Sequence, residues 1–530
     1  MPLLLLPMPL PFLSDSDLLV ARPPKGHYTR MLFWLDEQIW GHRVYPQTPW
    51  LMFLECLTVA EYFFREGSLL QEPDSYPALV YQPRRRMRLR NILWNNELIK
   101  SLEDEKLDSN TTWNKWLEWM KENVMHVTDT DFSYLKGRFE RFSDFAFLVG
   151  MLRDASVESE SNKRWTSRFL FPFGANAIYE DQDLNGKRGD YNNFTRTGEL
   201  LYLMLCRSAA ADSLRPYLHD FLKGDNEWNQ LLTVLERGPE KGDEERKDSY
   251  LPYKQHQCFD KLGQDWLNLF QLGLPNFDVL NHLVTLGAFH VLLYQLHVAA
   301  EWTGKAEPLT FLCEVVAPKK TLVREVSIIN FQENNGLSGD AVQAYITRIQ
   351  QSDAWQQALQ LHTPADVFDA CQQVLQKEIW WDDAADYDRS YDPDELLDYL
   401  REKAQVRHQQ HAGEVHRTLG RLIGLVSRRG TNKYRYAPTD GLLKTLIFAN
   451  VPHRMELKEF FQVLYSRYGL VFSEREAALV IAEDEYDPKP FAANAARLES
   501  RLNSLGLLRR LSDGCAYVIN PNGQASESHA

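Results

Sequence analysis

The stretch of sequence that decides the fold spans residues 440–519 and begins DGLLKTLIFAN (440–450). Its leucines and isoleucine recur at helical spacing, Asp440 is a residue type that caps helices, and Pro452 ends the run. A second amphipathic helix is predicted from about Glu456 to Tyr468, because a glycine follows it as a stop signal. Two consecutive helices are therefore expected at the start of this stretch.

The second half of the stretch is predicted to add further helices and a hairpin. Ser473 and Glu476 have the spacing of a capping box, and a longer helix is expected from about Pro490 to Ser504. The sequence LLRRLSDGCAYVI (507–519) then places two strand-like runs on either side of a turn at 512–514. The stretch is therefore predicted to end in a two-stranded hairpin.

Helices followed by a hairpin resemble the winged helix-turn-helix, and LNSLGLLRRLSDG (502–514) is similar to a recognition helix that runs into its wing. The resemblance covers residues 436–521 and implies a module that binds DNA or docks onto a protein partner. In a DNA-binding member, contacts with the major groove and the backbone would come from Arg497, Arg501, Arg509 and Arg510. Acidic residues between 474 and 487 favour protein docking instead, so both interpretations stay open.

Length and periodicity predict a mainly α, multi-domain helical protein with a C-terminal winged helix-turn-helix. At 530 residues the chain is long enough for several cores, and helical periodicity dominates outside a few short β-like runs. The expected divisions are an aromatic-rich helical region at 1–90, a helical domain at 91–240 with an irregular segment at 168–193, a helical domain with a few short strands at 249–400, a basic connector at 401–437, the winged helix at 438–521 and a disordered tail at 522–530.

Composition excludes several classes of protein. The net charge of -14 argues against a protein that coats nucleic acid by bulk charge, so any such contact requires a local basic surface. The six cysteines are widely spaced, which favours free thiols over a disulfide framework or a zinc ribbon. The start, MPLLLLPMPLPFL, has no basic residue before its apolar run and four prolines within it, unlike a signal peptide. With no membrane span expected, the sequence predicts a soluble, cytoplasmic protein without a membrane partner.

The charge reverses sharply in the last third of the chain. Residues 378–398 hold nine acids against one base, whereas residues 401–444 hold ten bases against three acids. A basic segment that leads into a winged helix suits binding to phosphates, and tyrosines between the bases suit stacking on nucleotides. The predicted contacts are Arg417, Arg421, Arg428, Arg429, Lys433 and Arg435. Alternatively, the acidic and basic blocks pair with each other and solubilise neighbouring helices.

A second basic run, RRRMRLR (84–90), holds five arginines: Arg84, Arg85, Arg86, Arg88 and Arg90. Its arginines would bind phosphates or an acidic partner. Alternatively, they would pair with acidic neighbours such as those at 103–105. If the protein encloses DNA, we expect this run and the segment 428–435 to lie on one continuous positive surface.

No catalytic, cofactor or metal site is predicted. The segment DQDLNG (181–186) matches the first half of a calcium loop, but Asn192 stands where a bidentate carboxylate is needed, which favours a surface turn. A metal-dependent nuclease would have to use Glu180, Asp181, Asp183 and Lys187. Walker, GxSxG and HExxH signatures are lacking from the sequence, so a non-catalytic role is favoured and the question of enzyme activity stays open.

The whole chain also resembles, in style, the large accessory proteins that are encoded in bacterial anti-phage defence operons beside ATPases, helicases or nucleases. That resemblance implies a role inside a multi-protein machine acting on foreign DNA. The leading hypothesis is a non-catalytic subunit that binds DNA or positions a DNA-acting partner. A protein-interaction scaffold whose winged helix docks a partner subunit is the alternative, and a metal-dependent nuclease is the third.

Overall fold

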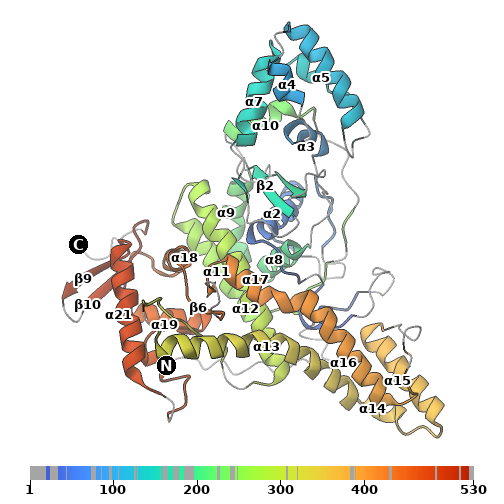
Figure 1. Ribbon diagram of the computed structural model, residues 1–530, viewed down its shortest axis with the longest axis vertical. Coiled ribbons are helices and arrows are strands. Elements are labelled where there is room, and N and C mark those ends of the chain that lie inside the picture. Colours follow the sequence, from blue (N-terminus) through green and yellow to red (C-terminus); the bar gives the residue numbers. More distant parts are fainter. Residues whose placement is uncertain are drawn as a thin grey trace.

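The computed structural model describes most of the chain. The described residues are 19–23, 34–42, 44–72, 79–84, 86–94, 98–104, 107–124, 127, 129–154, 157–158, 165–170, 178–183, 196–223, 227–238, 245–247, 249–305, 308–318, 320–381, 387, 389–428, 433–483, 486–512 and 515–523. Within them the structure has 21 α-helices and only short strands, which confirms the predicted mainly α, multi-domain class. Figure 1 shows a central body with a helical lobe above it, a helical arm at lower right and a C-terminal unit at left.

The central body is built around one long apolar helix. Its helices are α1 (Asp36–Ile39), α2 (Pro49–Arg65), α8 (Thr197–Cys206), α9 (Ala211–Lys223), α11 (Gln257–Gln271) and α12 (Asn276–Thr303). Helix α12 is surrounded by α2, α11, α13 (Leu322–Gln351) and α17 (Val415–Leu422) and is buried along most of its length. The sequence predicts one apolar block across residues 266–300, but Gly273 at φ +62° and Pro275 separate α11 from α12.

Helix α12 also bears on membrane association. It is the single helix in the described chain that is long and apolar enough to cross a membrane, contrary to the expectation that no such stretch exists. However, 89% of its most apolar window is buried inside the structure. Because a core helix of a soluble protein meets the same criteria, its burial fits a soluble protein.

The helical lobe has a hydrophobic core of its own. It comprises α3 (Met87–Leu93), α4 (Leu98–Asp104), α5 (Ser109–Asn123), α6 (Ser133–Lys136), α7 (Phe142–Asp154) and α10 (Glu227–Leu235). Trp113 and Trp116 pack with Phe142 and Phe145 at ring-centre distances of 4.9–6.3 Å. This second core is separate from that of the central body, and it combines residues 89–152 with residues 232–235.

A small antiparallel sheet overlaps the segment 168–193, for which the sequence predicts irregular structure. Strand β2 (Trp165–Leu170) pairs with β1 (Val157–Glu158) on one side and with β3 (Ile178–Asp183) on the other. The prediction of a turn-rich 168–193 is therefore wrong for residues 168–170 and 178–183. The polar sequence of β3 gives little alternation, so its strand state comes from pairing with β2.

The arm and the connector follow the body. The arm holds α13 (Leu322–Gln351), α14 (Asp353–Ala358), α15 (Pro364–Ile379) and α16 (Pro393–Gln410). The connector consists of a 3-10 turn (Ala412–Glu414), α17 (Val415–Leu422) and the paired strands β5 (Val426–Ser427) and β6 (Arg435–Tyr436). Threonine or aspartate followed by proline starts α15 and α16, because the side chain caps the helix and proline fits its first turn.

The C-terminal unit has the helices and hairpin that the sequence predicts, with two additional short strands. Its elements are α18 (Asp440–Asn450), β7 (Arg454–Glu456), α19 (Leu457–Tyr468), β8 (Leu470–Val471), α20 (Glu474–Ala477), α21 (Pro488–Ser504), β9 (Leu508–Ser512) and β10 (Cys515–Ile519). Strands β7, β10 and β9 form one antiparallel sheet in that order. Thr439 rather than Asp440 caps α18, and α20 is a single turn.

The C-terminal unit is joined firmly to the rest of the molecule. Strand β8 pairs in parallel with β4 (Phe311–Leu312), which precedes the arm. Asp265 of α11 accepts hydrogen bonds from Tyr468, at 2.7 Å, and from Arg467. The same carboxylate lies 2.7 Å from His290 of α12. These buried contacts fix the C-terminal unit against the central body.

Candidate nucleic-acid interface

Helix α17 carries the first part of the predicted basic surface. Its buried side faces the body through Val415, Leu419 and Gly420, which leaves Arg417 and Arg421 outside. Because these two arginines are four residues apart, they lie on the same face of the helix. Gly420 allows the close approach of β5, since a Cβ there would lie 2.7 Å from Val426. The local packing thus turns both arginines toward solvent.

Tyr434, just before β6, gathers cations from two elements. The guanidinium carbons of Arg428 and Arg417 lie 4.9 and 5.9 Å from the centre of its ring. Arg428 also donates a hydrogen bond to the Tyr434 hydroxyl at 3.3 Å. The ring in turn stacks on Phe331 of α13 at 5.5 Å. Tyr434 therefore positions two guanidinium groups at the surface rather than presenting a bare ring for base stacking.

We name the surface formed by Arg417, Arg421, Arg428, Lys433 and Lys444 the basic strip. Arg417 pairs with Glu414, whereas the other four, all exposed, have no carboxylate within ion-pair distance among the described residues. Arg421 and Lys444 line the same cavity, which connects α17 to α18. Sequence reasoning did not place Lys444 beside Arg421, because a single lysine on an amphipathic helix carries no signal of its neighbours in space.

Two other predicted members of this segment serve the fold. The side chain of Arg435 is only 3% exposed and pairs with Glu314, which is fully buried. Tyr436 is buried too, and its hydroxyl lies 2.9 Å from His416 and 3.0 Å from Asn334. The expectations that Arg435 contacts phosphates and that Tyr436 stacks on nucleotides are therefore wrong. Arg429 lies outside the described residues.

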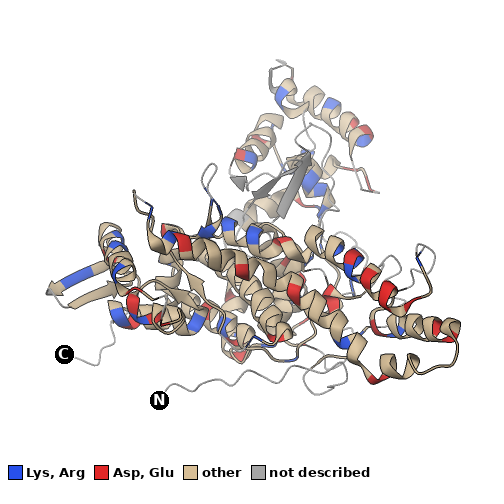
Figure 2. Cartoon of the chain, turned by 60° about the horizontal axis from the view of Figure 1, so that its bottom comes forward, with Lys and Arg blue, Asp and Glu red and all other residues tan. Residues whose placement is uncertain are grey.

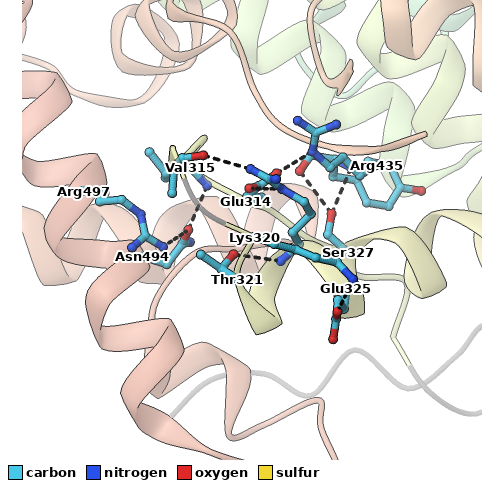
Figure 3. A network of polar contacts seen from close by, with 12 residues as sticks. Glu314, Val315, Lys320, Thr321, Glu325, Ser327, Arg435, Asn494 and Arg497 are labelled. Carbon is cyan, nitrogen blue, oxygen red and sulfur yellow. Dashed lines mark hydrogen bonds and ion pairs between the residues drawn. The ribbon is translucent and has the colours of Figure 1, made fainter. Parts of the chain in front are cut away.

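The ion pair of Arg435 belongs to a network that ties the connector to the C-terminal unit (Figure 3). Glu314 also accepts a hydrogen bond from Arg324 of α13 at 2.7 Å. Next to it, the backbone nitrogen of Val315 donates to Asn494 of α21 at 2.8 Å. The amide of Asn494 donates to the carbonyls of Cys313 and Phe472 at 2.9 and 3.0 Å. This buried network fixes the orientation of α21.

Two of the four predicted contacts within the C-terminal unit are neutralised by carboxylates. Arg501 pairs with Asp440 and donates to the carbonyl of Pro438 at 3.1 Å, and Arg510 lies 3.2 Å from Glu499. Arg497 is half-buried and contacts Asn494 at 3.4 Å. Arg509 is exposed, with no carboxylate partner among the described residues. Figure 2 shows basic residues on the hairpin near the C-terminus, but acids and bases intermingle over the helical body.

The run at 84–90 lies elsewhere and is also neutralised. Arg84 is 3.3 Å from Glu61, Arg86 is 3.4 Å from Glu236, and Arg88 pairs with Asp129. Arg90 is buried, and Arg85 lies outside the described residues. Figure 1 places α3, which contains most of the run, well away from α17 and α21. The run does not continue the basic strip, contrary to the expected single positive surface, and its described carboxylate partners are Glu61, Glu236 and Asp129.

The other candidate chemistry remains without a defined site. Glu180, Asp181 and Asp183 lie in strand β3, and Lys187 with the rest of the calcium-like segment lies outside the described residues. In the described part of the chain, no group of three or more His, Cys, Asp or Glu side chains is arranged to hold a metal ion.

Comparison with known proteins gives no relative from which a role could be transferred. No protein-family model matches the chain, and no curated protein or solved structure shows significant similarity to it.

Proposed function

We propose that the protein binds nucleic acid, with DNA as the expected partner, as a non-catalytic subunit of a cytoplasmic multi-protein complex. The observation that carries this proposal is the basic strip. With a net charge of -14 the chain has ample carboxylates, and it uses them to pair arginines elsewhere, as at Arg84, Arg86 and Arg88. Four neighbouring cations left without such partners suit an external polyanion.

We also propose that the C-terminal unit is a winged helix. Its order of helix, strand, helix, strand, two helices and hairpin supports this, as does a three-stranded antiparallel sheet in which β10 lies between β7 and β9. In this proposal α21 is the recognition helix and the 512–515 turn is the wing. Because Arg501 and Arg510 are paired internally, we assign the main phosphate contacts to the basic strip and a lesser one to Arg509.

The test compares two triple variants with equal loss of charge. Arg421, Arg428 and Lys433 are replaced by Gln in the first, and the exposed lysines Lys100, Lys121 and Lys377 in the second. Affinity for labelled single- and double-stranded oligonucleotides is measured by fluorescence anisotropy over a salt series. The first variant should bind more weakly, and its dependence of log affinity on log salt should flatten by about 0.7–0.9 per lost contact.

The second variant should retain the affinity and the salt slope of the wild type, because its lysines lie outside the strip. Failure of the wild-type protein to bind at low salt, or equal losses in both variants, would exclude the proposal.

One observation favours the scaffold alternative. Leu479 after α20, Leu505 after α21 and Leu511 in β9 are 67%, 40% and 59% exposed. Exposed leucines on a folded unit suit a protein interface. In this case the partner would be another subunit, such as an ATPase, a helicase or a nuclease, as the resemblance to anti-phage defence proteins implies. Co-purification with neighbouring gene products that is abolished by Leu505→Asp and Leu511→Asp, with oligonucleotide binding absent, would favour this alternative.

A further inference from the structure

A cavity of about 840 Å³ lies between α12, α17 and α18, at one end of the basic strip. Its volume is in the range of pockets that hold small ligands. Two of its walls carry cations, Arg421 from α17 and Lys444 from α18. Both are exposed and lack a carboxylate partner among the described residues. An anionic group that entered the cavity would therefore find two positive charges from different elements.

The first turn of α18 contributes backbone groups to the lining of the same cavity. Thr439 caps the helix by accepting a hydrogen bond from Leu442, and Gly441 lines the cavity. A Cβ at Gly441 would meet nothing nearer than 3.9 Å, so no other part of the chain fills the space beside it. Amide groups in the first turn of a helix favour phosphate oxygens. The carboxylate of Asp440 at this end is neutralised by Arg501.

The third wall comes from α12 and has a different chemistry. Asp278, Asn281 and Thr285 recur at helical spacing and line the cavity from one face of the helix. Near them Phe277 is 56% exposed, which is unusual for so large an apolar ring. His282 lies 2.7 Å from Thr445, and burial together with the charge of Lys444 lowers its pKa to about 4. It is therefore neutral at pH 7, and the wall offers hydrogen bonds and an aromatic surface.

We propose that this cavity binds one nucleotide unit. Its phosphate lies at Arg421, Lys444 and the first turn of α18, its base packs on Phe277, and its amino or hydroxyl groups bond to Asp278 and Asn281. The cations suit the phosphate of a nucleotide, the polar side chains suit its amino and hydroxyl groups, and the exposed aromatic ring suits the face of its base. The unit is either a free nucleotide or a nucleotide of a bound strand. The second case rests on the proposed function, whereas the first stands without it.

Two variants of the full-length protein test the proposal, with one control. Gly441→Leu projects a side chain into the cavity, and Lys444→Gln removes one cation. The control, Lys458→Gln, removes an exposed cation from α19, outside the cavity. Binding of AMP and ATP is measured by calorimetry, and binding of a single-stranded oligonucleotide by anisotropy. We expect both variants to weaken binding of at least one probe by about tenfold or more, and the control to leave it unchanged.

The probes separate the two sources of the ligand. Loss of AMP or ATP binding identifies a free nucleotide, and loss restricted to the oligonucleotide identifies a nucleotide of a strand. If neither variant changes the binding of any probe, the proposal is wrong. If the strip variant still loses oligonucleotide affinity in that case, the proposed function stands without this cavity. If the protein binds AMP or ATP but no oligonucleotide, and Gly441→Leu abolishes that nucleotide binding, the cavity proposal stands and the proposed function is wrong.

Discussion

The arginine run at 84–90 and the basic strip are similar in sequence and different in structure. Both are rich in arginine and lie in a net acidic chain, and sequence reasoning treats them alike. In the run, Arg84, Arg86 and Arg88 meet carboxylates from α2, from the end of α10 and from the loop before α6. In the strip, the cations beyond Arg417 meet an aromatic ring, a cavity or solvent.

This difference shows that local charge density does not identify a binding surface. What matters is whether the fold supplies a carboxylate to each cation, and those carboxylates come from distant parts of the chain. Glu236, for example, is 150 residues from Arg86. Ion pairs such as those of the run fix elements against each other, whereas cations without a carboxylate partner, such as those of the strip beyond Arg417, stay available to an external anion.

The largest effect is expected where an arginine of the connector is buried. Glu314→Gln removes the charge that compensates Arg435, whose side chain is 3% exposed, and it weakens the bond to Arg324. Breaking a buried ion pair costs about 3–5 kcal/mol, because the remaining charge is buried with neither a counter-charge nor water to compensate it. Urea denaturation should show a loss of this size. Glu325→Gln, which breaks the exposed pair with Lys320, is the control and should cost less than about 1 kcal/mol. Equal losses would contradict the structural role of Arg435.

A smaller effect is expected from pH, through His416 beneath the strip. Burial lowers the pKa of His416 to about 3, whereas an unfolded chain has a value near 6.5. Below pH 6.5 the imidazole of His416 is protonated in the unfolded state but stays neutral in the folded state. The stability due to this group is complete above that pH and is lost as the pH falls toward 3. Between pH 7 and pH 5 the loss is about 2 kcal/mol.

The variant His416→Gln isolates this contribution. Its difference in stability between pH 7 and pH 5 should be smaller than that of the wild type by about 2 kcal/mol. His282 and His297, whose pKa values burial lowers to about 4 and about 3, act in the same direction in both proteins. An unchanged difference would mean that His416 is protonated in the folded protein.

A third prediction tests whether the arginine run at 84–90 contributes to nucleic-acid binding as the basic strip is proposed to do. Arg88→Gln removes an ion pair with Asp129, in which the two side chains are 14% and 48% exposed. Because this pair is partly solvated, the free energy of unfolding should fall by about 1 kcal/mol or less. Oligonucleotide affinity should stay within about twofold, in contrast to the variant of the strip. A loss of affinity equal to that of the strip variant would restore the run as a nucleic-acid contact.

Sequence reasoning recovers local structure better than partners. Helical spacing and stop signals predict α18, α19 and α21, and the turn at 512–514 predicts the hairpin, because these signals are local. Strand β7 is three residues long and is stabilised by pairing with β10, so no periodicity marks it. The pairing of Arg435 with Glu314 and the meeting of Arg421 with Lys444 at one cavity depend on tertiary packing. Because the sequence does not reveal such tertiary contacts, some of the predicted arginines and lysines are exposed in the structure, whereas others are paired with carboxylates.

The smallest effect concerns the boundary between the strip and α21. Asp440→Asn weakens the ion pair with Arg501, in which the side chains are 28% and 53% exposed, so stability should change by less than about 1 kcal/mol. If α21 faces nucleic acid, the released guanidinium adds a phosphate contact, and affinity should rise about two- to threefold at low salt with a steeper salt slope. If α21 docks a protein, oligonucleotide affinity should stay the same. Asp487→Asn, at the start of α21, also removes a carboxylate without releasing Arg501. An equal rise in this control would show that general repulsion, rather than Arg501, limits binding.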